Sequence, residues 1–148
     1  MTKKHIITIA GSLGSGKSST AKKVAEMLEY EHASGGDFMR AIANERKISL
    51  EELSKLAETD KSIDEALDEQ NKKIGEKENI VIDSRLGFYF IPESFKVLLT
   101  LLPNIAAERI LNDSKVNPNR HKEAVDGFDT VENISRSITQ RLESERKR

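Results

Sequence analysis

The chain has 148 residues, enough for one domain, with 36% hydrophobic and 33% charged side chains and a net charge of −1. The near balance of 24 basic and 25 acidic residues argues against a nucleic-acid partner and against a membrane-surface protein. The lack of cysteine excludes disulfides and thiolate metal sites, and no apolar stretch approaches the length of a membrane span, so we expect a cytoplasmic protein.

The first elements alternate between strand and helix. Residues 5–10 form a short, β-branched apolar run, which predicts a buried parallel strand. A glycine-rich segment follows, and an amphipathic helix is predicted after it by apolar residues at i, i+3, i+4 and i+7: Ala21, Val24, Ala25 and Leu28. Residues 30–34 predict a short second strand.

The next segment is helical. We expect Gly35 and Gly36 to form a turn and Asp37 to cap a helix that runs to about Arg46. The pattern Ser-x-x-Glu then occurs twice, at residues 49–52 and 62–65, and each instance predicts a capping box at the start of a further helix. Residues 49–75 therefore read as a helical cap inserted between two strands.

The second half returns to strands. Residues 79–83 and 95–102 predict two more buried strands, and Pro103 suits the first turn of a helix. The polar stretch 112–126 contains a predicted loop at residues 117–119. A final charged helix carries a narrow apolar stripe: Val131, Ile134, Ile138 and Leu142. This alternation predicts an α/β fold in three layers, α/β/α, around a parallel sheet.

Residues 11–18 match the phosphate-loop pattern G-x-x-x-x-G-K-[ST] at every fixed position. Glycines let the backbone amides point inward, and the following helix directs its positive end at the same anion. Lys17 is expected to reach the β and γ phosphates of ATP, and the Ser18 hydroxyl to ligate Mg²⁺. The residues expected around the phosphates are Gly11, Ser12, Gly14, Ser15, Gly16, Lys17, Ser18 and Ser19.

A second candidate segment runs from Ser34 through Asp37 to Arg40. It is similar to the S/T-G-x-x-x-x-R segment of nucleoside monophosphate kinases, in which the arginine holds the phosphate of the acceptor. A guanidinium suits this task because it binds phosphate with two hydrogen bonds and stays charged. Taken alone, the segment equally fits a capped helix start with a solvated arginine.

Asp83 ends a predicted buried strand, where a carboxylate in a P-loop fold lies near the Mg²⁺. Arg85 follows and is expected to point into the same cleft, because ligands bind at the carboxyl ends of parallel strands. The alternative is an aspartate that only caps the next turn. Arg141 and Arg146 could stabilise the charge that spreads over a transferred phosphoryl group, or they could form a solvated basic face.

Together these segments resemble the cytidylate kinase family, and its short archaeal-type branch more than the longer bacterial one. The likeness covers residues 6–18, 34–40, 49–74, 83–86 and 107–110, and the R-x-E-S-E pattern that begins at Arg141. The D-G-F-P-R segment typical of adenylate kinases is replaced by Asp-Ser-Arg-Leu-Gly at residues 83–87. The resemblance thus implies CMP or dCMP as the acceptor.

The resemblance implies a single P-loop kinase domain over residues 1–148, with a nucleoside-monophosphate-binding cap at about 35–77 and a lid at about 112–148. It also implies that Arg109 lies against the ATP purine; a surface arginine is the alternative. Two other functions stay open. The chain could be another small-molecule P-loop kinase, such as an adenylate or uridylate kinase, or a truncated nucleotide-binding protein without catalysis.

Only four strands are predicted, and the usual order for this family would leave the strand at residues 95–102 at an open edge. Open edges pair with other chains, so a homodimer through this edge is one expectation. The histidines His5, His32 and His121 are scattered, form no metal-binding pattern and are treated as ordinary.

Overall fold

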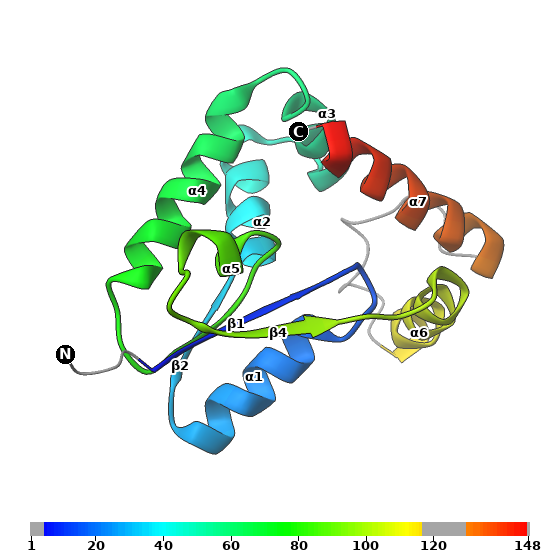
Figure 1. Ribbon diagram of the computed structural model, residues 1–148. Coiled ribbons are helices and arrows are strands. Elements are labelled where there is room, and N and C mark those ends of the chain that lie inside the picture. The colour runs from blue at the N-terminus through cyan, green and yellow to red at the C-terminus, as the bar shows by residue number, and fades with distance from the viewer. Residues whose placement is uncertain (1–4, 117–129, 148) are drawn as a thin grey trace.

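The computed structural model describes residues 5–116 and 130–147. In this part of the chain four parallel strands form one sheet in the order β2-β3-β1-β4, with helices between them (Figure 1). The strands are β1 (Ile6–Gly11), β2 (Glu31–Ser34), β3 (Ile80–Asp83) and β4 (Phe95–Leu99). The helices are α1 (Lys17–Leu28), α2 (Gly35–Arg46), α3 (Leu50–Leu56), α4 (Lys61–Gly75), α5 (Gly87–Phe90), α6 (Pro103–Val116) and α7 (Val131–Lys147).

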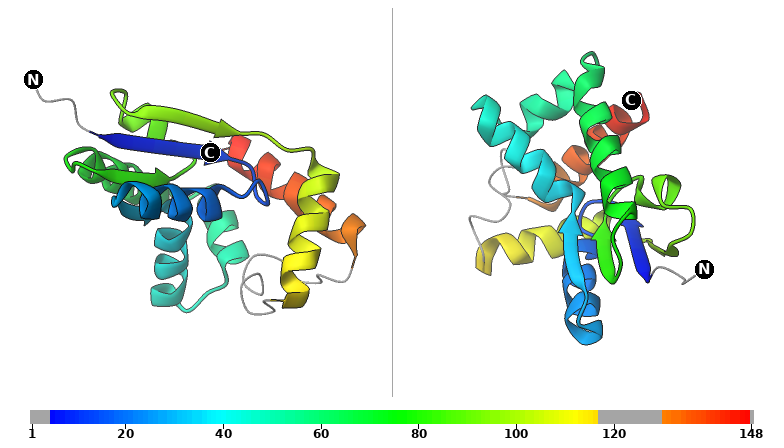
Figure 2. Two further views of the ribbon diagram at one scale, coloured as in Figure 1. Left: turned by 90° about the horizontal axis from the view of Figure 1, so that it is seen from below. Right: turned by 90° about the vertical axis from the view of Figure 1, so that its left-hand side faces the viewer.

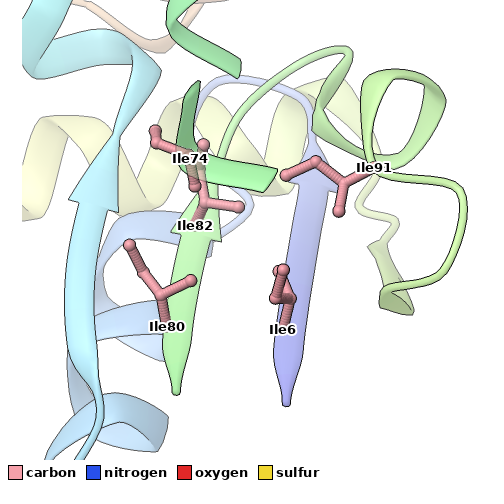
Figure 3. Close-up of a cluster of buried hydrophobic side chains, with 5 residues drawn as sticks. All are labelled: Ile6, Ile74, Ile80, Ile82 and Ile91. Carbon is pink, nitrogen blue, oxygen red and sulfur yellow. The ribbon is translucent and has the colours of Figure 1, made fainter. Parts of the chain in front are cut away.

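Both faces of the sheet are covered, which confirms the three-layer prediction. Because side chains alternate along a strand, Ile9 of β1 and Val81 of β3 face α1, where Ala21 and Ala25 pack on them. The opposite face is covered by the end of α4 and the segment after α5. It carries a cluster of five buried isoleucines, drawn in Figure 3: Ile6, Ile74, Ile80, Ile82 and Ile91.

Helices α2, α3 and α4 occupy the chain between β2 and β3 and share a small core of their own. The buried members of this core are Ala43, Leu53, Ala57 and Ile63. The two alanines leave room for the larger leucine and isoleucine side chains to pack between the helices. The three helices thus form a compact unit at the carboxyl end of β2, next to the phosphate loop.

The helix caps differ in part from the sequence prediction. The capping box at Ser49 and Glu52 is confirmed. Ser34, not Asp37, caps α2: its hydroxyl accepts from the Asp37 amide, and Gly35 and Gly36 form the first helical turn instead of a separate turn. The predicted box at residues 62–65 is wrong, because the Asp60 carboxylate caps α4 by accepting from the Ser62 amide.

Two other boundaries differ. The strand β4 ends at Leu99, three residues before the predicted end, and α6 continues through the polar residues 112–116. The short helix α5 has no clear sequence signal. The predicted loop at 117–119 lies outside the described residues, as do His121 and part of the predicted lid.

Helices α6 and α7 lie beyond the point where β4 ends (Figure 2). They pack together through a cluster that also receives Leu13 of the phosphate loop; its buried members are Ala106, Ala107, Ile110, Ile134 and Ile138. The far end of α7 reaches the cap, where Ser144 donates a hydrogen bond to Glu58. One helix therefore connects the phosphate loop to the cap.

Within the described residues, β4 pairs only with β1 and its other side is open. Phe95 and Leu98 are 70% and 71% exposed there. The predicted open edge is therefore present in this part of the chain. Over the same residues, no helix has the length and hydropathy needed to cross a membrane.

Candidate active site

The phosphate loop is built around backbone that favours glycine. Gly14 and Gly16 have φ of 78° and 85°, in the left-handed region. At Gly11 an added Cβ would lie 2.6 Å from the Ser15 hydroxyl oxygen and 2.9 Å from the Leu99 carbonyl oxygen. The loop is thus closed tightly between β1 and α1, and the Ser15 amide donates to the Ser12 carbonyl within it.

Two features of this loop suit an anionic ligand. The hydroxyl of Ser15 is buried, and no described residue shares a hydrogen bond with it. No side chain caps the N-terminus of α1, where Gly16 stands as N-cap. A polyphosphate would supply acceptors for both the hydroxyl and the uncapped amides.

Lys17 is the cation at the centre of the loop. Its burial lowers the pKa below the ordinary 10.5, and the guanidinium of Arg141 lowers it further. Arg40 acts in the same direction, whereas the carboxylates of Asp83 and Glu145 oppose the shift. Lys17 is thus a partly desolvated cation with two arginines near it, and a bound polyphosphate would stabilise its charge.

Asp83 is buried at the end of β3 and accepts hydrogen bonds from both neighbouring elements. The hydroxyl of Ser18 lies 3.1 Å from its Oδ1, and that of Ser34 lies 2.9 Å from the same atom. The other carboxylate oxygen of Asp83, Oδ2, lies 2.6 Å from Nε2 of His32. The carboxylate is thus fixed in one orientation next to the loop hydroxyl.

His32 is the residue here that sequence reasoning missed. It has no ligand pattern, yet it lies two residues before Ser34 on β2, and Ser34 is in register with Asp83. Residues two apart on a strand share a face. Pairing of the two strands would have pointed to His32, but the order of the strands cannot be read from the sequence.

Of the residues at 34–40 predicted to bind the acceptor, only some lie near the phosphate loop. Ser34 is occupied by its cap and by Asp83. Asp37 is exposed and forms an ion pair with Arg40, its neighbour one turn along α2. Arg40 is itself half exposed, close enough to Lys17 to influence its pKa.

The arginines fall into different positions. Arg85 and Arg141 line one pocket with Lys17. Arg85 donates to the carbonyl of Glu145 on α7 and lies 3.9 Å from the carboxylate of Asp64 on α4. Arg109 lies on the outer side of the loop, in a groove with Ser12 and Ser18. Arg146 is exposed and lines neither cavity.

The pocket that holds Lys17 continues away from the phosphate loop to the cap. Its far wall is one face of α4, and Met39 of α2 also lines the pocket. None of the site residues predicted from the sequence lies on this wall, which consists of Asp64, Leu67, Asp68 and Asn71. Their spacing of i, i+3, i+4 and i+7 marks a single helix face, but it does not indicate that the face borders a cavity.

The donor set suits Mg²⁺, which prefers oxygen ligands and keeps several waters. The Ser18 hydroxyl and the Asp83 carboxylate supply two such oxygens 3.1 Å apart. Over residues 5–116 and 130–147, no group of three or more histidine, aspartate or glutamate side chains could hold a metal by itself. A cation here would therefore depend on the ligand phosphates for the rest of its coordination.

The fold and the loop define a P-loop protein of the small-molecule kinase type. The profile of a family described as "AAA domain" matches residues 10–112. A shikimate kinase from Bacteroides thetaiotaomicron superimposes with a TM-score of 0.61 over 96% of this chain and 79% of its own, at 17% identity. That likeness concerns the fold alone.

Relatives in sequence are more specific. A cytidylate kinase from Methanosphaera stadtmanae is 33% identical over 145 residues, which is 97% of this chain and 76% of that protein. One from Haloarcula marismortui is 43% identical over 108 residues, 71% of this chain. The chain belongs to the cytidylate kinase family. Its match spans 56% of the length of the Haloarcula relative.

Proposed function

We propose that this protein transfers the γ-phosphoryl group of ATP to a nucleoside monophosphate, most favourably CMP or dCMP. The observation that carries the proposal is the continuous pocket from Lys17 and Arg141 to the α4 face of the cap. A donor phosphate at one end and an acceptor nucleoside at the other would meet within it. Membership of the cytidylate kinase family supports the choice of acceptor.

On the donor side, the amides of residues 11–18 and the ammonium of Lys17 hold the ATP phosphates. Arg109 stacks on the purine, since a guanidinium plane binds well on an aromatic ring. Its position in the groove on the outer side of the loop supports this role. Ser18 and Asp83 hold Mg²⁺, which neutralises the phosphate oxygens of ATP when bound.

On the acceptor side, Arg40 and Arg85 bind the phosphate of the monophosphate. An oxygen of that phosphate attacks the γ-phosphorus, the bond to the β–γ bridging oxygen breaks, and ADP leaves. Negative charge spreads over the transferred group, and Lys17 and Arg141 stabilise it. No covalent intermediate with the protein is needed, because the residues act by position and charge.

The cap at about 35–77 and the lid at about 112–148 close over this reaction. The contact between Ser144 and Glu58 supports a closed arrangement, since it joins α7 to the cap. Closure excludes water, which limits hydrolysis of ATP.

The open side of β4 is the basis of a second, structural part of the proposal. An edge strand with exposed apolar side chains can pair with the same strand of a second copy. We therefore assign a homodimer to this edge, separate from the active site.

The proposal is tested by ADP release with ATP, Mg²⁺ and each of CMP, dCMP, UMP, AMP and GMP. We expect release that depends on the acceptor, fastest with CMP or dCMP. Fastest release with AMP or UMP would instead assign an adenylate or uridylate kinase. Binding of ATP without release by any acceptor would identify a nucleotide-binding protein without this catalysis.

A further inference from the structure

The α4 wall of the pocket carries polar groups that the transfer chemistry does not use. Asp68 and Asn71 are three residues apart, so their side chains are neighbours on one helix face, about 5–6 Å apart at Cβ. Both line the pocket, and Met39 and Leu67 line it beside them. Apolar side chains next to a fixed polar pair are what a flat heterocyclic ring needs for its faces and its edge.

Asn71 is nearly completely buried, with an exposed fraction of 6%. Its amide oxygen accepts a hydrogen bond, 3.1 Å long, from the hydroxyl of Ser84. Among the described residues nothing accepts a hydrogen bond from its amide nitrogen. Because Asn71 lines the pocket and this nitrogen is not one of the fully buried unpartnered atoms of the described chain, its N–H groups are open to a ligand that offers an acceptor.

Asp68 complements this donor with an acceptor. None of the described residues donates a hydrogen bond to its carboxylate. Partial burial raises the pKa of Asp68, and the nearby carboxylate of Asp64 raises it further, while the cations of Lys72 and Arg85 act the other way. This environment suits a carboxyl group whose hydrogen-bond donor belongs to a ligand.

We propose that Asn71 and Asp68 select the base of the acceptor by its hydrogen-bonding edge. The Asn71 nitrogen donates to N3 of cytosine, and the Asp68 carboxylate accepts from the exocyclic N4 amino group. The inference rests on the proposed function, since it assigns the cap end of the same pocket to the nucleoside. Beyond that function, it names Asn71 and Asp68 as the residues that discriminate between the bases of different acceptors.

The pair rejects uracil at both positions. Uracil presents an N3–H donor to the Asn71 donor and a carbonyl oxygen to the Asp68 carboxylate, so neither hydrogen bond forms and like groups face each other. Adenine has an amino group beside a ring nitrogen, in the same order as cytosine. The pair therefore separates amino bases from keto bases, and the size of the ring must separate CMP from AMP.

The sharpest test exchanges the two residues. The double variant Asp68→Asn/Asn71→Asp keeps the composition, net charge and side-chain volumes, but it reverses the order of donor and acceptor. The probes are CMP and UMP, titrated separately by calorimetry into the full chain. For the wild type we expect CMP to bind about tenfold or more tightly than UMP, because UMP loses the hydrogen bond to the charged Asp68 and leaves the Asn71 donor unpaired. For the exchanged variant we expect UMP to bind the more tightly.

Two further variants keep the test decisive if the buried Asn71 tolerates no change. Asp68→Asn alone, at a site that is only half buried, should narrow the CMP-to-UMP affinity ratio at least about threefold, since an amide offers a donor to O4 of uracil. Glu69→Gln removes the same charge from an exposed neighbour outside the pocket and should leave the ratio unchanged.

The inference is overturned if the wild type binds CMP and UMP equally, or if Asp68→Asn keeps the wild-type ratio. Phosphoryl transfer is measured in parallel on the same samples. If the protein transfers phosphate to CMP but the variants keep the wild-type CMP-to-UMP affinity ratio, the proposed function stands and this inference is wrong. Selective binding that the exchange reverses, without any transfer, would support the base selection and remove the proposed function.

Discussion

The buried carboxylate of Asp83 is fixed in one orientation by its hydrogen-bond partners. Three polar side chains, from Ser18, Ser34 and His32, surround it, and together they fix which oxygen faces the phosphate loop. Groups around a metal-binding carboxylate orient it and tune its affinity, although they touch neither metal nor substrate. We expect His32 to be such a positioning residue, because it contacts Oδ2 of Asp83 while Ser18 contacts Oδ1.

Replacement of this histidine tests its role. His32→Gln should lower phosphoryl transfer about 10–100-fold, because Asp83 loses its closest partner and its orientation. The measurement is the Mg²⁺ concentration that gives half-maximal transfer, which should rise in the variant. His5→Gln is the matched control, since His5 contacts Tyr30 instead of the site. An unchanged Mg²⁺ requirement in His32→Gln would exclude the positioning role.

At this scale the sequence identifies the residues that belong to a consecutive motif. The loop from Gly11 to Ser18 is predictable because its glycines, lysine and serine are required at fixed spacing. His32 and Asn71 are not predictable in the same way. Each reaches the site through strand pairing or helix orientation, and each looks like an ordinary strand or helix residue in the sequence.

At the scale of elements, apolar runs and hydrophobic periodicity predicted β1, β3, β4 and most helices. The strand β2 was predicted at residues 30–34 without such a run, and β4 is largely exposed although its apolar run predicted a buried strand. Helix starts were less predictable. Ser62 fits a capping pattern, but Asp60 stands two residues earlier and competes for the same amides. A local pattern cannot decide between two adjacent acceptors, because the choice depends on the path of the preceding chain.

The N-cap residues of α3 and α4 should contribute different amounts to the stability of the folded protein. Ser49→Ala should cost about 1 kcal/mol, the usual value for an N-cap serine. Asp60→Ala should also lower the melting temperature, and Ser62→Ala should lower it less. Hydrogen bonds from Ser62 lower the pKa of Asp60 below its ordinary 3.8. The stability that this cap adds is therefore present above pH 3.8 and disappears as the pH falls through the lowered pKa.

Thermal unfolding of the three variants at pH 7 and at acidic pH provides the measurement. The deficit of Asp60→Ala relative to the wild type should shrink in acid. If Ser62→Ala were as destabilising as Ser49→Ala, the capping box at residues 62–65 would be present in solution and the cap at Asp60 would be wrong.

At the scale of the whole molecule, the sheet leaves one side of β4 open within the described residues. Leu98 is 71% exposed on this strand, so Leu98→Lys should change the free energy of unfolding by no more than about 0.5 kcal/mol. The same change places a charge on the edge, where it opposes pairing between copies.

Light scattering over a range of protein concentrations tests the homodimer. The wild type should approach twice the chain mass of 16.6 kDa, whereas Leu98→Lys should remain close to the single-chain value. A wild type that stays at 16.6 kDa at every concentration would exclude the homodimer.

The whole account depends on the phosphate loop as a binding site for a nucleoside triphosphate. The direct measurement is calorimetric titration of ATP and Mg²⁺ into the wild type and Lys17→Met. We expect saturable binding to the wild type and at least about a hundredfold weaker binding to the variant, since the loss removes a buried charge pair with phosphate. Without nucleotide, Lys17→Met should be as stable as the wild type, because the lowered pKa of Lys17 means that the empty site disfavours its charge. A folded wild type that binds no triphosphate, or a Lys17→Met variant that binds ATP as tightly, would contradict the account.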